Sequence, residues 1–296
     1  MGLSDPNFDV SATVYNDIRP PYLSEQVDFV IERTGLTPDD VVADIGAGTG
    51  KLSRMFTPNE SGKTSCKQVI CVEPSNQDGG MVDECHKNMA PYATAATVVT
   101  GEATATGLAD KSVKLIVIGD AAHWFQPAEP VCKEFKRILK EDGKMAVFVR
   151  FPDPKAEIVQ DLHKALKENC KTYRSTANKL VNDIDIVAKK SGEHLLEPEL
   201  TTSSQSYLKA TWTKEELLRY LQSRSSTNSW ALEKENEALI YEKVIDPLFE
   251  KHARNTDKIS IPHISLVTIG KVRKYEPLKS AERRDRDQKN AGEGIL

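Results

Sequence analysis

Ten residues, Val41–Gly50, constrain the fold more than any other part of this 296-residue sequence. They read VVADIGAGTG: an apolar run typical of a buried strand reaches Asp44, and Gly46, Gly48 and Gly50 follow at every second position. Glycine lacks a Cβ, so it adopts left-handed backbone conformations and lets a ligand approach the main chain closely. The pattern therefore predicts a strand and a turn that line a nucleoside-like cofactor, with a carboxylate at the strand tip.

The glycine spacing distinguishes two classes of cofactor. A dinucleotide-binding fingerprint has Gly-x-Gly-x-x-Gly at the start of a helix that holds a pyrophosphate. Here the third glycine comes one residue early, and Lys51 follows it. The pyrophosphate interpretation is therefore disfavoured, whereas a turn that binds no ligand stays open on the glycines alone.

Four more apolar runs follow this turn, and each contains a stretch with the length of a strand. They are Val69–Pro74, Thr97–Ala103, Leu115–Phe125 and Met145–Phe151. An amphipathic run, Val131–Lys144, precedes the last of them and predicts a helix that ends near Gly143. Strands that alternate with helices predict a parallel sheet with helices on both faces.

Acidic residues stand at or near the ends of four of these strands, at Asp44, Glu73, Glu102 and Asp120. Ligands of open parallel sheets bind beyond the carboxyl ends of the strands. We therefore expect the four carboxylates to gather at one edge of the sheet. Any one of them is readily explained as a solvated loop residue, but four in succession favour a binding site.

The glycine turn and the acidic strand tip at Glu73 resemble the class I S-adenosylmethionine-dependent methyltransferases. The resemblance implies an α/β fold, a doubly wound and mostly parallel seven-stranded sheet with a helical cap insertion. It also implies that S-adenosylmethionine is the cofactor, with both ribose hydroxyls donated to the carboxylate of Glu73. The cofactor contacts that it implies are Tyr15, Arg19, Asp44, Gly46, Ala47, Gly48, Gly50, Glu73, Pro74, Ser75, Glu102, Ala103 and Asp120.

The segment before the glycine turn carries the pattern Tyr15-x-x-x-Arg19-Pro-x-Tyr22. It is similar to a subgroup of small-molecule methyltransferases that includes trans-aconitate methyltransferase. There the segment folds over the cofactor as a lid, which implies that these three residues close the site and that Tyr22 contacts substrate. The alternative is structural, with the arginine paired to a carboxylate and the tyrosines packed.

Five segments are expected along the chain. They are a lid and helix over 1–40, a cofactor-binding core over 41–151, a cap insertion over 152–212, C-terminal helices and a last strand over 213–275, and a disordered tail over 276–296. The cap is expected to roof the acceptor and set substrate choice. Pro247 should bend or break the helix in which it falls.

Methyl transfer requires little of the protein beyond the alignment of donor and acceptor. A sulfonium is a strong methyl donor, so the main tasks are to hold donor and acceptor in line and to exclude water. His123 is the candidate general base for an acceptor that must lose a proton; alternatively it shapes the pocket without moving a proton. His123 and Trp124 are also expected to contact substrate, the latter through its aromatic face.

Composition narrows the class of protein. The chain has 40 basic and 44 acidic residues, so no strong field attracts nucleic acid or an anionic membrane. Five cysteines without paired spacing predict reduced thiols in the cytoplasm, no metal-ligand spacing is present, and no apolar stretch is long enough to span a membrane.

We therefore expect a cytoplasmic enzyme, a monomer or homodimer, that methylates oxygen, nitrogen or a carboxyl group of a small acceptor. Two alternatives stay open at this point. The acceptor could be a protein or nucleic acid, or the chain could bind the cofactor without turnover and act through partners.

Overall fold

The computed structural model describes residues 12–58, 65–74, 80–170, 173, 192–224 and 226–275. Ser75, an expected cofactor contact, and the expected tail, 276–296, lie outside the described residues. The strands are β1 (Val41–Ile45), β2 (Gln68–Glu73), β3 (Ala96–Thr100), β4 (Val113–Gly119), β5 (Leu139–Pro152), β6 (Leu196–Trp212) and β7 (Ile259–Val272). The α-helices are α1 (Ala12–Ile18), α2 (Ser24–Thr34), α3 (Met81–Met89), α4 (Ala128–Ile138), α5 (Glu157–Asn169), α8 (Lys214–Gln222), α9 (Asn228–Ala231), α10 (Glu237–Ile240) and α11 (Asp246–His252).

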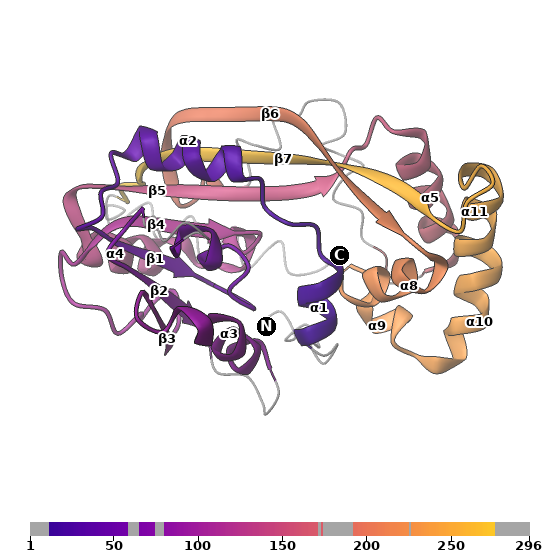
Figure 1. The fold of residues 1–296 in the computed structure, drawn as a ribbon, viewed down its shortest axis with the longest axis horizontal. Helices are drawn as coiled ribbons and strands as arrows, with labels where there is room; N and C mark the ends of the chain where they lie inside the picture. The colour runs from indigo at the N-terminus through magenta and orange to yellow at the C-terminus, as the bar shows by residue number, and fades with distance from the viewer. Residues whose placement is uncertain are drawn as a thin grey trace, which may run out of the picture.

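One seven-stranded sheet organises these elements, in the order β3-β2-β1-β4-β5-β7-β6 (Figure 1). The strands from β1 to β5 pair in parallel, β7 runs antiparallel to β5, and β6 runs antiparallel to β7. The expected doubly wound, mostly parallel seven-stranded sheet is confirmed.

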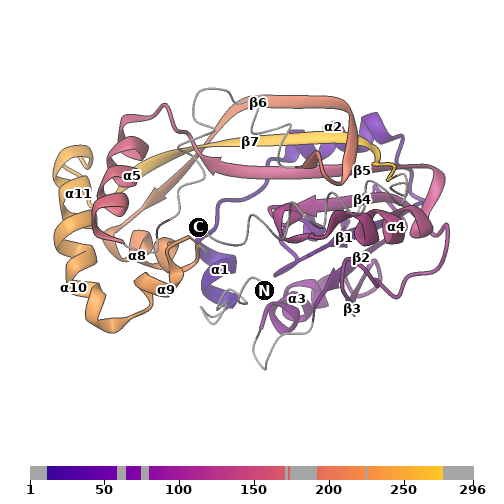
Figure 2. The same ribbon diagram turned by 180° about the vertical axis from the view of Figure 1, so that it is seen from behind.

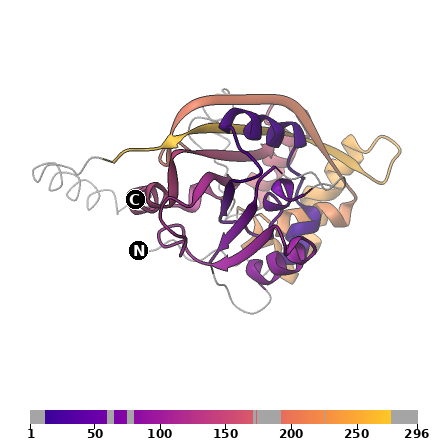
Figure 3. The same ribbon diagram turned by 60° about the vertical axis from the view of Figure 1, so that its left-hand side comes forward.

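The sheet is covered on both faces because its central strands are apolar on both sides. Leu115, Ile116, Val117 and Ile118 of β4 are all fully buried, as in a parallel strand that is covered on both faces. One buried cluster joins the sheet to α2 and α3, and another joins it to α4 through Phe135. Figure 3 shows α2 lying across the sheet where it packs on β5 and β7.

Two expectations about element boundaries are wrong. α4 ends at Ile138, not near Gly143, because Leu139 is already extended and pairs with Val113 of β4. Residues 196–212, which were expected to belong to the cap, form the edge strand β6 and pair with β7 from Leu196 to Trp212.

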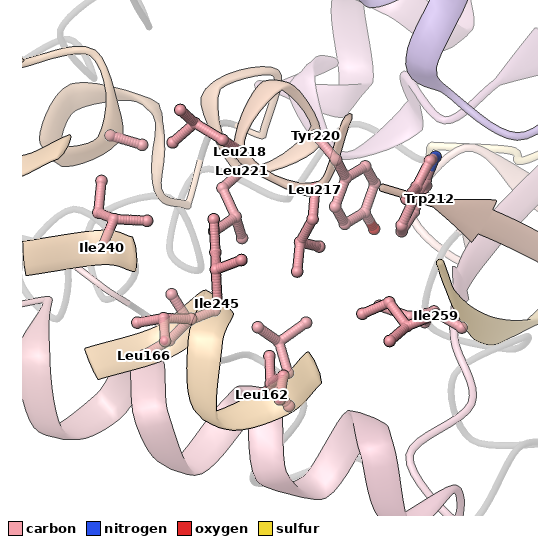
Figure 4. Packing of buried hydrophobic residues seen from close by; sticks show 14 of the residues in the cluster. Leu162, Leu166, Trp212, Leu217, Leu218, Tyr220, Leu221, Ile240, Ile245 and Ile259 are labelled. Atoms are coloured by element: carbon pink, nitrogen blue, oxygen red, sulfur yellow. The ribbon is translucent and has the colours of Figure 1, made fainter. Parts of the chain in front are cut away.

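Helices α5 and α8–α11, which we call the helical end, gather where β5 stops (Figures 1 and 2). They enclose a second hydrophobic core, in which Leu162, Leu217 and Ile245 point toward one another (Figure 4). The ring of Trp212, at the end of β6, stacks on that of Tyr220 with centroids 4.2 Å apart. The helical end is therefore packed on the ends of β6 and β7, which contribute Trp212, Ile259 and Ile261 to its core.

Pro247 falls in a helical stretch that runs from α10 to α11 without a break. Tyr241–Ile245 form a π-helical turn between α10 and α11, and the proline falls in the first turn of α11. The helix is therefore irregular just before the proline but is not broken there. Within the described part of the chain, no helix combines the length and apolarity needed to cross a membrane.

Truncating the second core should destabilise the whole fold. Leu162 is fully buried on α5, so Leu162→Ala is expected to lower the free energy of unfolding by about 2–5 kcal/mol. Urea denaturation followed by circular dichroism measures this change. The control Lys164→Ala, on the exposed face of the same helix, should change it little; equal effects would contradict the packing described here.

Candidate functional site

The turn after β1, Ile45–Lys51, which we call the glycine loop, depends on three left-handed residues. Gly46, Gly48 and Gly50 have φ values of 72°, 56° and 77°. A Cβ on Gly46 would lie 2.9 Å from the Cβ of Ala121, and one on Gly50 would lie 3.1 Å from the sulfur of Cys85. A Cβ on Gly48 would meet no atom within 4 Å. Two of the glycines are thus required by packing, whereas Gly48 faces open space.

Two buried carboxylates flank this loop. Asp44, at the tip of β1, accepts a 2.6 Å hydrogen bond from Ser53 Oγ, while its Oδ1 is buried without a hydrogen-bond partner. Glu73, at the tip of β2, accepts a 2.8 Å hydrogen bond from the backbone N–H of Gly48. Burial raises the pKa of each carboxyl group to about 7. Such groups favour a ligand that donates hydrogen bonds to them.

Asp120 is less available to a ligand than Asp44 and Glu73, because both of its carboxylate oxygens accept hydrogen bonds from Arg150. Its Oδ1 accepts from the backbone N–H of Arg150 at 2.8 Å, and its Oδ2 accepts from Nε and Nη2 at 2.9 and 2.7 Å. The guanidinium also donates to the carbonyl of Pro20 and lies 3.6 Å from the centroid of the Tyr22 ring. Sequence reasoning missed Arg150, whose nearest signal is its place at the end of an apolar strand.

Tyr22 is buried against the sheet. Its ring meets Phe148 edge-on with centroids 5.9 Å apart. A Cβ on Gly119 would lie 2.3 Å from its hydroxyl oxygen, which explains the glycine at the tip of β4. The packing alternative describes this tyrosine better than a direct substrate contact.

Helix α1 contacts the glycine loop on one side and α8 on the other. Thr49 Oγ1 donates to Asn16 Oδ1 at 3.1 Å. Arg19 Nη2 donates to the carbonyl of Ser223 at 2.9 Å, and its guanidinium lies 4.9 Å from the Tyr15 ring centroid and 5.7 Å from that of Tyr220. The N-terminal segment thus meets the candidate cofactor site, as a lid would.

The remaining expected residues lie at the same edge with different exposure. Glu102 is exposed and forms a short bridge with Ala105, while Ala103 packs on the α4 side of the sheet. Pro74 is exposed and Ala47 is buried. The structure therefore places Glu73 against the glycine loop, which contains Ala47, and Asp44 directly before that loop, but it leaves Glu102 on the surface.

His123 and Trp124 follow β4 in a short 3₁₀ turn, Ala122–Trp124, with their ring centroids 4.7 Å apart. Both side chains are exposed. Desolvation by the surrounding protein lowers the pKa of His123, against the attraction of Asp120 and together with repulsion from His194 and Arg19. A neutral imidazole at pH 7 can accept a proton.

Comparison with known proteins identifies the domain. A model described as a methyltransferase domain matches residues 43–147. An uncharacterized methyltransferase of Schizosaccharomyces pombe is 26% identical over 85% of this chain and 91% of its own length. One from Mycobacterium bovis is 28% identical over 53% of this chain and 57% of its own.

The chain is an S-adenosylmethionine-dependent methyltransferase, and its methyltransferase domain is matched over residues 43–147. A solved structure from Anaeromyxobacter dehalogenans, titled as a type II methyltransferase, shares the fold with a TM-score of 0.56 at 16% identity, over 86% of this chain and 97% of that one. The finer resemblance to the trans-aconitate methyltransferase subgroup stays a prediction.

The residues of the site fit the cofactor of this methyltransferase. Glu73 offers carboxylate oxygens for a vicinal diol, the unpartnered Oδ1 of Asp44 can accept a further hydrogen bond, and open space lies at Gly48. Among the described residues, no group of three or more His, Cys, Asp or Glu side chains is placed to hold a metal ion.

The carboxylate of Glu73 should lower the stability of the cofactor-free protein as the pH rises. Because burial raises its pKa from 4.5 to about 7, the folded methyltransferase binds more protons than the unfolded chain between these values. The cofactor-free protein should therefore become less stable as the pH rises from about 5 to 8. Glu73→Gln is expected to reduce this loss, seen by thermal unfolding at pH 6 and pH 8.

The same substitution should weaken S-adenosylmethionine binding at least about tenfold, since hydrogen bonds to a charged group are lost. Calorimetric titration measures the affinity. Glu32→Gln, at an exposed position of α2, is the matched control and should change neither quantity. Unchanged affinity in a folded Glu73→Gln protein would contradict the assignment of Glu73 to the cofactor.

Proposed function

We propose that this methyltransferase acts on a small organic acceptor that carries a negative charge. The supporting observation is a pair of arginines, Arg19 and Arg224, on the ring of Tyr220. Their guanidinium carbons lie 5.7 and 5.4 Å from the ring centroid. The Tyr220 hydroxyl accepts a 3.0 Å hydrogen bond from Nη1 of Arg224.

Neither arginine has a carboxylate within ion-pair distance in the part of the chain that the structure describes. The Nε of Arg19 is buried without a hydrogen-bond partner. Partly buried guanidinium groups are costly unless an anion pairs with them, and carboxylates and phosphates suit their planar donor geometry. A bound anionic acceptor would supply that partner.

Aromatic and neutral side chains surround the ring of Tyr220 beside this arginine pair. Trp212 and Tyr220 stack there, and His263 meets both rings edge-on. Burial lowers the pKa of His263 to about 4, so it is uncharged at pH 7. His263 therefore neither adds to nor offsets the positive charge of the two guanidinium groups, which supports selection for an anion.

Methyl transfer to such an acceptor is an in-line displacement. Bound S-adenosylmethionine supplies an electrophilic methyl group on a sulfonium. A lone pair of the acceptor forms the new bond to this methyl as the carbon–sulfur bond breaks, leaving S-adenosylhomocysteine. The protein's part is to hold the acceptor by its charge, align it and exclude water.

We also propose roles for the other residues near the glycine loop. Tyr15, Asp44, the glycine loop, Glu73 and Glu102 are the candidate cofactor contacts, whereas Arg19 and Trp124 are candidate acceptor contacts. All five cysteines are free and buried, which supports a reducing compartment such as the cytoplasm. A monomer or homodimer is the expected assembly.

Removing one positive charge should weaken acceptor binding selectively. Arg224→Gln is expected to raise KM for an anionic acceptor by about tenfold to a hundredfold, because charge-assisted hydrogen bonds are lost. Transfer of a radiolabelled methyl group to a panel of small carboxylic acids and their amides measures this. The affinity for S-adenosylmethionine should not change.

Arg33→Gln, at an exposed position on α2, is the control for a lost charge elsewhere. Preferential transfer to the amides, or equal KM values in both variants, would contradict an anionic acceptor. Methylation of proteins or nucleic acid alone, or binding of the cofactor without turnover, would favour the two alternative functions.

His123 should matter only for acceptors that must lose a proton. A carboxylate arrives ionised, so His123→Gln is expected to change kcat for a carboxylic acid by less than about tenfold. For a hydroxyl or ammonium acceptor the loss should reach about a hundredfold. The pH profile of kcat separates the cases, and a hundredfold loss with a carboxylic acid would contradict this role.

A further inference from the structure

Lys51 ends the glycine loop and reaches across to helix α1. Its Nζ lies 2.5 Å from the backbone carbonyl oxygen of Asn16 and 2.6 Å from that of Arg19. Thr49, two residues earlier, donates to the Asn16 side chain and accepts from Asn88 Nδ2 of α3 through its carbonyl at 2.9 Å. The loop that lines the cofactor is thus bonded directly to the C-terminal end of α1.

The charge of Lys51 suits these partners. The last carbonyl groups of a helix have no partner within it and carry partial negative charge, so a cation is stabilised there. Burial lowers the pKa of Lys51 to about 8, together with repulsion from Arg150, Arg54 and Arg19 and against Asp17. The group is still mostly protonated at pH 7.

Lys51 depends on these carbonyls. In the described residues no carboxylate lies within ion-pair distance of its ammonium group, and its hydrogen bonds go to Asn16 of α1 and to Arg19 just after that helix. Moving α1 away would leave a partly buried charge without partners, which is costly. The same contacts therefore resist displacement of the helix.

Helix α1 also contacts the rest of the site. Thr13 donates to Glu84 of α3 at 3.0 Å, and Arg19 binds the carbonyl of Ser223 just after α8. Figures 1 and 2 both show α1 between the parallel strands and the helical end. A change in the position of α1 therefore affects the glycine loop and the proposed acceptor site together.

We propose that Lys51 is a positioning residue that clamps α1 onto the glycine loop and so limits the rate at which the cofactor product leaves. The clamp joins a loop that lines the cofactor to a helix that closes over it. Its breakage frees the helix and relaxes the loop in the same step. The inference does not depend on which acceptor is methylated.

Hydrogen exchange and product dissociation test this proposal. In Lys51→Met, backbone amides of residues 12–19 should exchange about tenfold faster or more, because two hydrogen bonds from a charged donor are lost. Dissociation of S-adenosylhomocysteine, followed by stopped-flow fluorescence, should accelerate by a similar factor. Lys51→Arg should restore most of both, since a guanidinium can donate to both carbonyls.

The control is Lys67→Met, an exposed lysine next to β2, which should match the wild type. If folded Lys51→Met matches this control in both measurements, the proposal is overturned. If Lys51→Met does not fold, wild-type protein decides: S-adenosylhomocysteine should slow exchange in residues 12–19, and unchanged exchange there would overturn the clamp.

Discussion

The arrangement of the site depends on one buried ion pair. Arg150 is almost wholly inside the protein, and a buried guanidinium is tolerated only with a counter-ion and satisfied donors. Asp120 provides the counter-ion, although it must adopt a left-handed backbone conformation with φ of 52° to do so. Pro20 and Tyr22 complete the contacts. The pair thereby fixes the tips of β4 and β5 and the segment that links α1 to α2.

Local sequence patterns predicted part of this site, but they did not predict the partner of Asp120. The glycine loop, Asp44 and Glu73 were predictable because a local pattern, a strand followed by special backbone conformations, determines them. Arg150 was not, because its partners lie 30 and 130 residues away in sequence. Its identity as a partner is a property of the sheet order, which brings β4 next to β5.

Strand β6 was mispredicted for a related reason. Its sequence, LEPELTTSSQSYLKATW, lacks the continuous apolar run of an inner strand. An edge strand pairs on one side only, and the charged side chains Glu197 and Glu199 with Pro198 are common devices that discourage further pairing. These are also the residue types that suggest a loop. Only its partner β7, which is plainly apolar, makes the assignment possible.

Strand β7 takes part in both hydrophobic cores. Ile259 and Ile261 pack within the helical end, and Val267 and Ile269 pack within the sheet. No change of element separates the two groups, since the strand is continuous from Ile259 to Val272. It pairs with β5 from His263 to Gly270 and with β6 from Ile259 to Val272.

A continuous strand of this kind joins the two halves of the molecule without a hinge of its own. Rigid-body closure, in which one half swings over a ligand, needs a few residues that can absorb a large change in backbone angles. Strand β7 itself stays extended across the junction, paired with β5 as far as His263 and with β6 on either side of an irregularity between Ser204 and Leu208. Access to a site beside this strand then depends on the short segments at its rim, such as α1, rather than on a swing of one half of the molecule over the other.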